Sequence, residues 1–128
     1  MTIELDHIIL AVNDRVTSID FYTDIVGLKH EGDRGPFSML RVTPSFVIQI
    51  AQWGTTGGTH LAFAMPKSEF LTAFERIKVA GIAYGDQYNA VGNMLGPGNE
   101  SASRGMGKTM YFFDPDKHLL EIRHYDLE

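Results

Sequence analysis

Three side chains that stand far apart in the chain have the types that bind a divalent metal ion: His7, His60 and Glu121. Two imidazoles and one carboxylate supply the nitrogen and oxygen donors that a borderline divalent ion prefers, and they leave coordination positions open for water or substrate. The chain has no cysteine, so thiolate ligands and disulfides are excluded. The pattern therefore predicts an open metal site of the kind used in catalysis.

Glu121 is the most informative of the three. It stands among Leu119, Leu120 and Ile122, where an unpaired buried carboxylate would carry a heavy desolvation cost. A bound metal ion would satisfy this carboxylate, and an ion pair with Arg123 is the structural alternative. A single histidine in a strand is more often a structural residue than a ligand, so the metal hypothesis depends on all three side chains sharing one face.

The elements that would position these residues occur twice, each time as a strand, a helix and three further strands. Each half begins with a strand that holds one of the histidines, and a glycine follows each amphipathic helix as a stop signal. The spacing from His7 to Gly27 and from His60 to Gly81 differs by one residue, so the halves look like copies. The predicted strands are 5–12, 28–34, 37–43, 46–52, 59–65, 83–88, 108–113 and 119–124, and the predicted helices are 15–26 and 68–80.

The linker TTGGT at 55–59 separates a first module of about 1–54 from a second of about 59–128. We expect residues 1–128 to form one domain, because 128 residues are too few for two independent cores. The segment from about 90 to 107 is rich in Gly, Asn and Ser and is predicted to be a loop. It suits a flexible lid from which Arg104 or Lys108 could reach an anionic substrate, with a simple surface loop as the equal alternative.

Alternation along the strands separates two faces. Large apolar residues fall on one face and would form the core beneath the helices; polar groups set among small ones fall on the other, as in a cavity wall. The predicted core residues are Ile8, Leu10, Val12, Ile48, Ile50, Leu61, Phe63, Met65, Leu120 and Ile122. The predicted wall residues are His7, Ile9, Ala11, Gln49, Ala51, His60, Ala62, Ala64, Glu121 and Arg123.

Composition excludes several classes of partner. The chain is 44% hydrophobic and 21% charged, which is the balance of a globular protein and not of a disordered one. Its net charge of -5, without a cluster of Lys and Arg, argues against a nucleic-acid partner. The absence of a basic, then apolar N-terminal segment and of a long apolar window argues against a signal peptide and a membrane span, so we expect a cytoplasmic protein.

With these features the chain resembles the vicinal oxygen chelate superfamily, which includes glyoxalase I, extradiol dioxygenases, fosfomycin-modifying transferases and bleomycin-resistance proteins. The resemblance implies an α+β fold in which two βαβββ modules form a curved eight-stranded mixed sheet around a metal-binding cavity, with the helices on the outer face. It also implies a homodimer, in which the modules pair within one chain or are exchanged between subunits. The segments that carry it are LDHIILAVND, FYTDIVGL, THLAFAM and MYFFDPDKHLLEIRHY. The ligands that it implies are His7, His60 and Glu121.

The departures from each branch of the family are also informative. Glyoxalase I has a second glutamate where this chain has Gln49, and an amide cannot act as a general base. Fosfomycin transferases have a hydroxyl residue at the position of Ile9, and bleomycin-resistance proteins lack the metal ligands. Extradiol dioxygenases have a tyrosine ten residues before the glutamate, as Tyr111 stands before Glu121 (121 − 111 = 10), but their second-shell histidine has no match here.

The leading hypothesis is a metal-dependent enzyme for a small molecule with two adjacent oxygens, with an extradiol-type ring-cleavage dioxygenase favoured. The ion would be Fe(II) or Mn(II) in preference to Ni(II), Zn(II) or Co(II). Tyr111 would donate a hydrogen bond or a proton, and Gln49, Arg104, Lys108 and Arg123 would bind the substrate. The alternatives are a glyoxalase-type lyase or isomerase, a thiol transferase, and a metal-free protein that sequesters a drug or metabolite.

Overall fold

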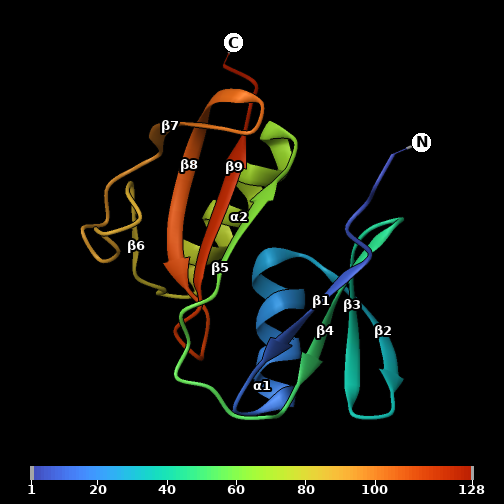
Figure 1. Cartoon of the computed structure of the whole chain (residues 1–128). Coiled ribbons are helices and arrows are strands. Elements are labelled where there is room, and N and C mark those ends of the chain that lie inside the picture. Colours follow the sequence, from blue (N-terminus) through green and yellow to red (C-terminus); the bar gives the residue numbers. More distant parts are fainter. Residues whose placement is uncertain (1, 128) are drawn as a thin grey trace. The chain divides into compact units, whose positions relative to one another are not determined.

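The structure is a computed structural model that describes residues 2–127. The chain divides into two compact units, Met1–Thr56 and Gly57–Glu128, and the division lies within the predicted linker. Each unit begins with a strand and a helix and continues with strands, so the α+β class is confirmed (Figure 1). The predicted order βαβββ holds in the first unit, whereas the second unit has one further strand after its helix.

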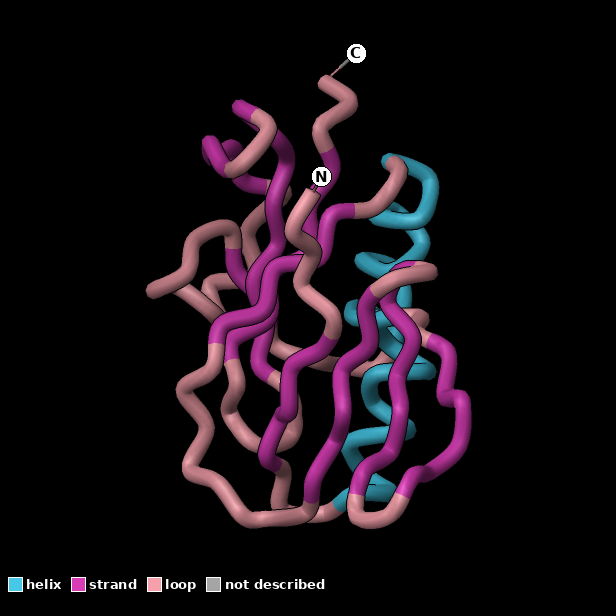
Figure 2. Tube along the Cα trace, turned by 45° about the vertical axis from the view of Figure 1, so that its right-hand side comes forward, coloured by secondary structure: helices cyan, strands magenta, loops and turns pink. Residues whose placement is uncertain are grey.

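The first unit contains four strands and two helical segments, which are β1 (His7–Ala11), α1 (Arg15–Phe21), the π-helical η1 (Tyr22–Val26), β2 (Lys29–Arg34), β3 (Phe37–Thr43) and β4 (Phe46–Ala51). The sheet order is β1-β4-β3-β2. β1 is parallel to β4, and the other neighbours are antiparallel. Figure 2 shows these strands side by side with the helix against one face. Because α1 packs on β3 and β4, aliphatic side chains on that face, including Leu10, Ile48 and Ile50, are fully buried.

The predicted helix 15–26 changes type halfway. α1 ends at Phe21, and η1 continues with the wider turn in which the N–H of Gly27 reaches the carbonyl of Tyr22 at 3.0 Å. This turn keeps Tyr22 and Val26 buried. Gly27 then ends the segment in the left-handed conformation, as predicted, with φ 96°. A run of apolar residues at helical spacing does not distinguish an α-helix from such a π-helical end.

The second unit contains five strands and one helix, which are β5 (His60–Ala64), α2 (Lys67–Val79), β6 (Tyr84–Gly85), β7 (Gly98–Ala102), β8 (Gly105–Phe113) and β9 (Leu119–His124). β5 is parallel to β9, β9 is antiparallel to β8, and both β6 and β7 pair with the other edge of β8. α2 packs against β9. Phe63, Phe70 and Ile122 are among the buried residues between them.

The segment predicted as a loop at 90–107 contains β7 and the start of β8, joined by a turn at Ser103 and Arg104. The loop prediction is therefore wrong for 98–102 and 105–107. Its glycines allow backbones to approach closely: a Cβ on Gly98 would collide with the backbone oxygen of Asp86, and one on Gly107 would lie 2.6 Å from that of His124. Pairing with β8 outweighs the low strand propensity of this sequence.

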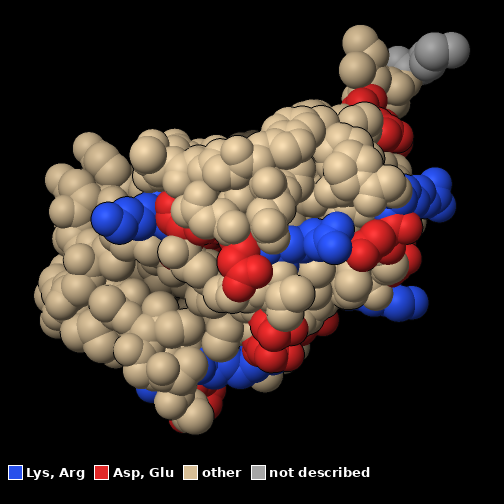
Figure 3. Space-filling view, turned by 90° about the horizontal axis from the view of Figure 1, so that it is seen from below, with Lys and Arg blue, Asp and Glu red and all other residues tan. Residues whose placement is uncertain are grey.

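The predicted core is largely confirmed. Seven of its ten residues are buried, and Ile8, Leu61 and Met65 are half-buried. No helix within residues 2–127 has the length and apolar character needed to cross a bilayer. On the face shown in Figure 3, basic and acidic side chains adjoin one another instead of forming a patch of one sign.

Candidate functional site

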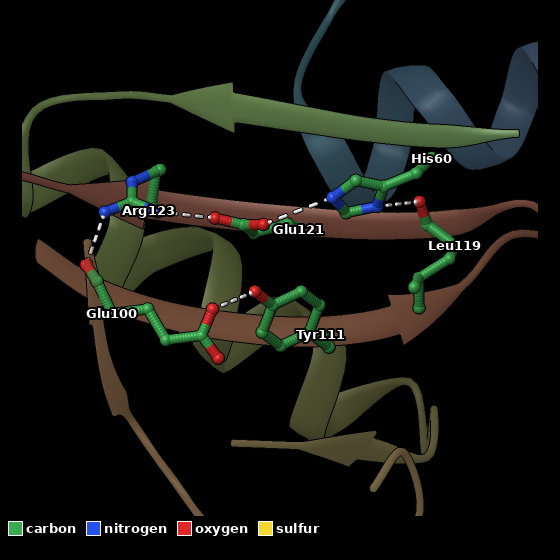
Figure 4. A network of polar contacts seen from close by, with 6 residues as sticks. All are labelled: His60, Glu100, Tyr111, Leu119, Glu121 and Arg123. Carbon is green, nitrogen blue, oxygen red and sulfur yellow. Dashed lines mark hydrogen bonds and ion pairs between the residues drawn. The ribbon is translucent and has the colours of Figure 1, made fainter. Parts of the chain in front are cut away.

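The second unit gathers polar side chains on one face of its sheet, along β5, β9, β8 and β7 (Figure 4). Tyr111 is paired directly with Glu121 in the register of β8 and β9, and Ala62 is paired with Glu121 in that of β5 and β9. Because side chains alternate along a strand, His60 and Arg123 lie on this same face. Ala62, a small residue, thus stands next to Glu121 across the pair of strands.

His60 and Glu121 face each other. The Nδ1–H of His60 donates to the carbonyl of Leu119 at 3.1 Å, and its Nε2 lies 3.3 Å from Oε1 of Glu121. A neutral ring that donates from Nδ1 has a lone pair on Nε2, so a proton or a cation must separate two acceptors at this distance. Two donors that each lie about 2.0–2.2 Å from one ion would be about 3.0–3.5 Å apart at ordinary coordination angles. The pair therefore fits a metal ion, and an imidazolium–carboxylate ion pair is the alternative.

Glu121 is also held by Arg123. The Nη1 of Arg123 lies 2.8 Å from Oε2 of Glu121, and both side chains are buried. The ion pair that the sequence offers as an alternative to metal binding is thus present, but it occupies Oε2, whereas His60 faces Oε1. One carboxylate can serve both interactions.

Tyr111 packs beside this pair and is 3% exposed. Its ring stacks on that of His60, with centroids 6.2 Å apart, and its hydroxyl donates to Oε2 of Glu100 at 2.6 Å. Burial, the hydrogen bond to Glu100 and the nearby charge of Glu121 raise the pKa of Tyr111 above its usual value. The phenol therefore stays protonated, and its one proton is already committed to Glu100.

Glu100 is the residue of this cluster that the sequence analysis does not identify. It lies on β7, and besides accepting from Tyr111 it accepts at its backbone carbonyl from Nη2 of Arg123 at 2.8 Å. The residues around Glu100 have the composition of a loop, so the sequence did not indicate a strand there. Glu100 could have been identified only from the pairing of β7 with β8, which places it opposite Gly107 and on the same face as Tyr111.

The third predicted ligand, His7, belongs to the first unit. Its Nδ1–H donates to Oδ2 of Asp6 at 2.7 Å, so the ring is oriented by a carboxylate, as is common for metal-bound histidines. His7 lines a cavity of about 460 Å³ together with Gln49 and Met39, which are paired opposite each other on β4 and β3. Gln49 thus lies in the wall that the sequence predicts for it.

Two arginines also line this cavity, and the sequence analysis does not identify them. Arg41 is held by Glu31, with Nη2 3.0 Å from the carboxylate. Arg34 lies at the end of β2. The carboxylates of Glu4, Asp6 and Glu31 line it as well, so the wall carries charges of both signs and can bind a small polar molecule.

The structure does not bring Arg104 or Lys108 to the His60 cluster. Arg104 lies in the turn between β7 and β8 and stacks on Tyr125, with its guanidinium carbon 4.4 Å from the ring centroid. Lys108 donates to Asn99 at 2.6 Å. By alternation along β8, Lys108 lies on the face opposite that of Tyr111.

Of the three predicted ligands, the structure therefore brings His60 and Glu121 together. No cluster of three or more His, Asp or Glu side chains that could hold a metal ion occurs among residues 2–127.

Comparison with known proteins gives one family and several similar structures. The family model described as the Glyoxalase/Bleomycin resistance protein/Dioxygenase superfamily matches residues 4–122. Oxidase ChaP-H2 is 30% identical, with 98% of this chain and 95% of that chain covered and a TM-score of 0.80. An integron cassette protein from the mobile metagenome of V. cholerae is 25% identical over 98% of both chains, with a TM-score of 0.79.

The fosfomycin resistance protein FosX from Listeria monocytogenes is 23% identical, with 99% of this chain and 97% of that chain covered and a TM-score of 0.70. At this identity the likeness concerns the fold alone.

Proposed function

Because the chain belongs to the Glyoxalase/Bleomycin resistance protein/Dioxygenase superfamily, we propose that it is a divalent-metal enzyme that acts on a small molecule with two adjacent oxygens. His7, His60 and Glu121 would hold the ion. The observation that carries the proposal is the pair of His60 Nε2 and Glu121 Oε1 at 3.3 Å, with the other nitrogen of the ring fixed by a carbonyl. The ring of His7 is oriented in the same way, because its Nδ1–H donates to the carboxylate of Asp6 and leaves Nε2 available.

When bound, the ion would stabilise negative charge on two adjacent substrate oxygens. Two neutral imidazoles and one carboxylate would leave a divalent ion with a formal charge of about +1, which suits an anionic bidentate ligand. The cavity of about 460 Å³ beside His7 has the size of a small-molecule site. Gln49, Arg34 and Arg41 in its wall would bind polar groups of the substrate.

Within this class we favour ring cleavage by a dioxygenase that uses Fe(II) or Mn(II). Gln49 lies beside His7 in the cavity wall, where an amide cannot remove a proton. This disfavours an isomerase or lyase that needs a base at that position. The similarity to a protein described as an oxidase, at 30% identity, also supports oxidative chemistry.

The rival function is a metal-free binding protein. It is favoured by the ion pair between Arg123 and Glu121, which neutralises the buried carboxylate without a metal. In that case His60 and Glu121 would form an imidazolium–carboxylate ion pair, and His7 would be a polar residue in the wall of the cavity.

Anaerobic reconstitution of the full chain with Fe(II), Mn(II), Ni(II) or Zn(II), followed by aerobic assays, tests these functions. Substrates would be a panel of catechols, the hemithioacetal of methylglyoxal and glutathione, and fosfomycin. We expect oxygen consumption and a yellow ring-opened product with Fe(II) or Mn(II), and none in Glu121→Gln. The matched control is Glu69→Gln, which removes an exposed carboxylate on α2.

The other outcomes distinguish the alternatives. Turnover of the hemithioacetal with Ni(II) or Zn(II) would replace ring cleavage by a glyoxalase-type reaction. Turnover of fosfomycin that requires an added thiol would indicate a thiol transferase. A protein that takes up no divalent ion at micromolar concentration, and whose melting temperature is the same with metal or EDTA, would be the binding protein.

A further inference from the structure

We propose that the second unit carries a binding site for the phosphate group of a small molecule at the N-terminal end of α2. The site is a cavity of about 380 Å³ at the end of β5 that lies away from His60. His60 begins this strand and Ala64 ends it, about 13 Å further along. The inference therefore goes beyond the proposed metal site and does not depend on it.

The cavity lies against the start of α2, where Pro66 and Lys67 form part of its wall. The first hydrogen bond of the helix joins the N–H of Phe70 to the carbonyl of Pro66 at 2.9 Å. The amides before Phe70 therefore have no carbonyl partner within the helix. Pro66 occupies the N-cap position and has no side-chain group that could accept from them. A helix end of this kind attracts an anion, because its amides and the helix dipole both favour negative charge.

A buried imidazole on the inner side of the cavity is the second, independent observation. His124 lines the cavity, is 3% exposed, and packs edge to face on Phe70 in the first turn of α2, with ring centroids 4.8 Å apart. Its Nδ1 is buried and has no hydrogen-bond partner among residues 2–127. An Nδ1–H that donates to a bound anion would remove the cost of leaving this atom unpaired.

Two cations and one carboxylate also line the cavity. Lys67 and Arg104 supply the positive charges and Asp126 the negative one. Figure 1 shows the turn between β7 and β8, which holds Arg104, at the same end of the second unit as the start of α2. The guanidinium of Arg104 stacks on Tyr125, with its central carbon 4.4 Å from the ring centroid. This contact uses the flat face of the guanidinium and leaves the N–H groups along its edge for a ligand.

The arrangement of these donors favours a phosphate group over a carboxylate. The donors come from three places, which are the end of α2, the end of β9 and the β7–β8 turn. A tetrahedral phosphate presents three acceptor oxygens in different directions, whereas a planar carboxylate presents two. The cavity is larger than a phosphate ion, and Met65 and Tyr125 add apolar surface to its wall. The ligand that fits is therefore a phosphate ester of a small organic molecule.

The test uses the full chain labelled with ¹⁵N and phenyl phosphate as the probe, in the presence of EDTA so that no metal ion can bind the probe. We expect saturable binding that shifts the amide resonances of residues 67–69 and the ring nitrogens of His124. Inorganic phosphate, which lacks the organic part, and benzoate, which lacks the tetrahedral group, should each bind about tenfold more weakly.

Two variants remove the cations from the exposed side of the cavity. Lys67→Gln and Arg104→Gln should each weaken the binding of phenyl phosphate by about tenfold, as expected for the loss of one charge-assisted hydrogen bond. The matched control is Lys78→Gln, which removes the same charge near the other end of α2, where Lys78 pairs with Glu75. This control should bind the probe as the unaltered protein does.

Two further variants test the buried imidazole. His124→Asn keeps a polar group close to the position of Nδ1 and should retain most of the binding, whereas His124→Phe keeps only the shape of the ring and should lose about tenfold in affinity. If His124→Phe does not fold, the variants of Lys67 and Arg104 decide the question in the same titration.

Several results would overturn the site. They are the absence of saturable binding up to about 10 mM phenyl phosphate, an equal loss in Lys78→Gln and in the two cavity variants, and shifts confined to the surroundings of His60. Binding of benzoate as tight as that of phenyl phosphate would overturn the assignment to phosphate. Because the titration contains no free metal ion, none of these results bears on the proposed function, which is tested separately by metal reconstitution.

Discussion

His60 and Glu121 contact each other, with Nε2 of the imidazole 3.3 Å from Oε1 of the carboxylate. The side chain of His60 is 47% exposed to solvent, whereas that of Glu121 is only 6% exposed. The carboxylate is fixed from within by Arg123, and the imidazole is fixed at its edge by the carbonyl of Leu119. Because the inner residue is fixed and the outer one faces solvent, the pair would be open to an entering ion if the proposed metal site is correct.

Metal binding should stabilise the fold through His60. With Zn(II) at 100 times its dissociation constant, we expect the free energy of unfolding to rise by about 2.7 kcal/mol. His60→Ala should abolish most of this gain. The matched control, His30→Ala, removes an imidazole that pairs with Asp33 in the first unit and should keep the gain. Thermal melting with and without Zn(II) measures both, and an equal gain in His60→Ala would exclude this residue as a ligand.

Arg123→Met should lower the free energy of unfolding, because it leaves the buried carboxylate of Glu121 without its arginine partner. Removal of one partner from a buried ion pair costs about 3–5 kcal/mol, and both side chains here are buried. Urea unfolding measures the loss, and added Zn(II) should recover part of it because the ion takes over as counter-charge. Arg41→Met, which breaks the partly exposed pair with Glu31, should cost about 0–1 kcal/mol.

Tyr111 should make stability fall at high pH. Burial and the hydrogen bond to Glu100 raise the pKa of Tyr111 in the folded state, so its contribution is fully present below the unfolded pKa of about 10 and is lost as pH rises toward the folded pKa. Between the unfolded and the folded pKa, the free energy of unfolding should fall by about 1.4 kcal/mol per pH unit because of this residue. Tyr111→Phe should remove this slope, whereas Tyr88→Phe at an exposed position should not.

Gly107→Ala should disrupt the link between Arg123 and Glu100. The added Cβ would lie 2.6 Å from the backbone oxygen of His124 and 2.8 Å from Nη2 of Arg123, and overpacking of this kind costs about 1–3 kcal/mol. Ser101→Ala on the exposed side of β7 is the control and should be nearly neutral. Unfolding by urea tests the cost; a neutral Gly107→Ala would show that the end of β9 and the side chain of Arg123 can shift without loss.

Gln49→Glu should move the site toward glyoxalase-type chemistry. The new carboxylate would lie in the cavity wall beside His7, where it could bind metal and accept a proton. With Ni(II) or Zn(II), we expect isomerisation of the hemithioacetal to rise by about 100-fold, the lower range of general-base effects. Gln52→Glu, at a side chain that caps the N–H of Arg15, is the control. No gain would mean that position 49 does not face the ion.

Strand periodicity predicts much of this fold and part of its site. The strands at 37–43 and 119–124 agree with β3 and β9 at both ends. Period-two alternation also places His60 and Glu121 on one face, because it depends only on the geometry of an extended chain. The α+β class and the order βαβββ of the first unit follow from the same pattern.

The parts that sequence reasoning misses depend on contacts between distant segments. β7 is a strand because β8 pairs with it, and its own residues favour a loop. Glu100 gains its place only through that pairing. The carbonyl of Leu119 fixes the ring of His60. Because it is a backbone group that every residue has, its role cannot be recognised from the sequence.

β7 hydrogen-bonds to a single neighbour within its sheet, β8. Insertions or substitutions along its outer side would therefore disturb no further strand, whereas β9, which carries Glu121, is held on both sides by β5 and β8. Relatives could have a different residue at position 100 while retaining the central strands β5, β9 and β8. Differences between close homologues on this face of the sheet should then fall on the β7–β8 hairpin first.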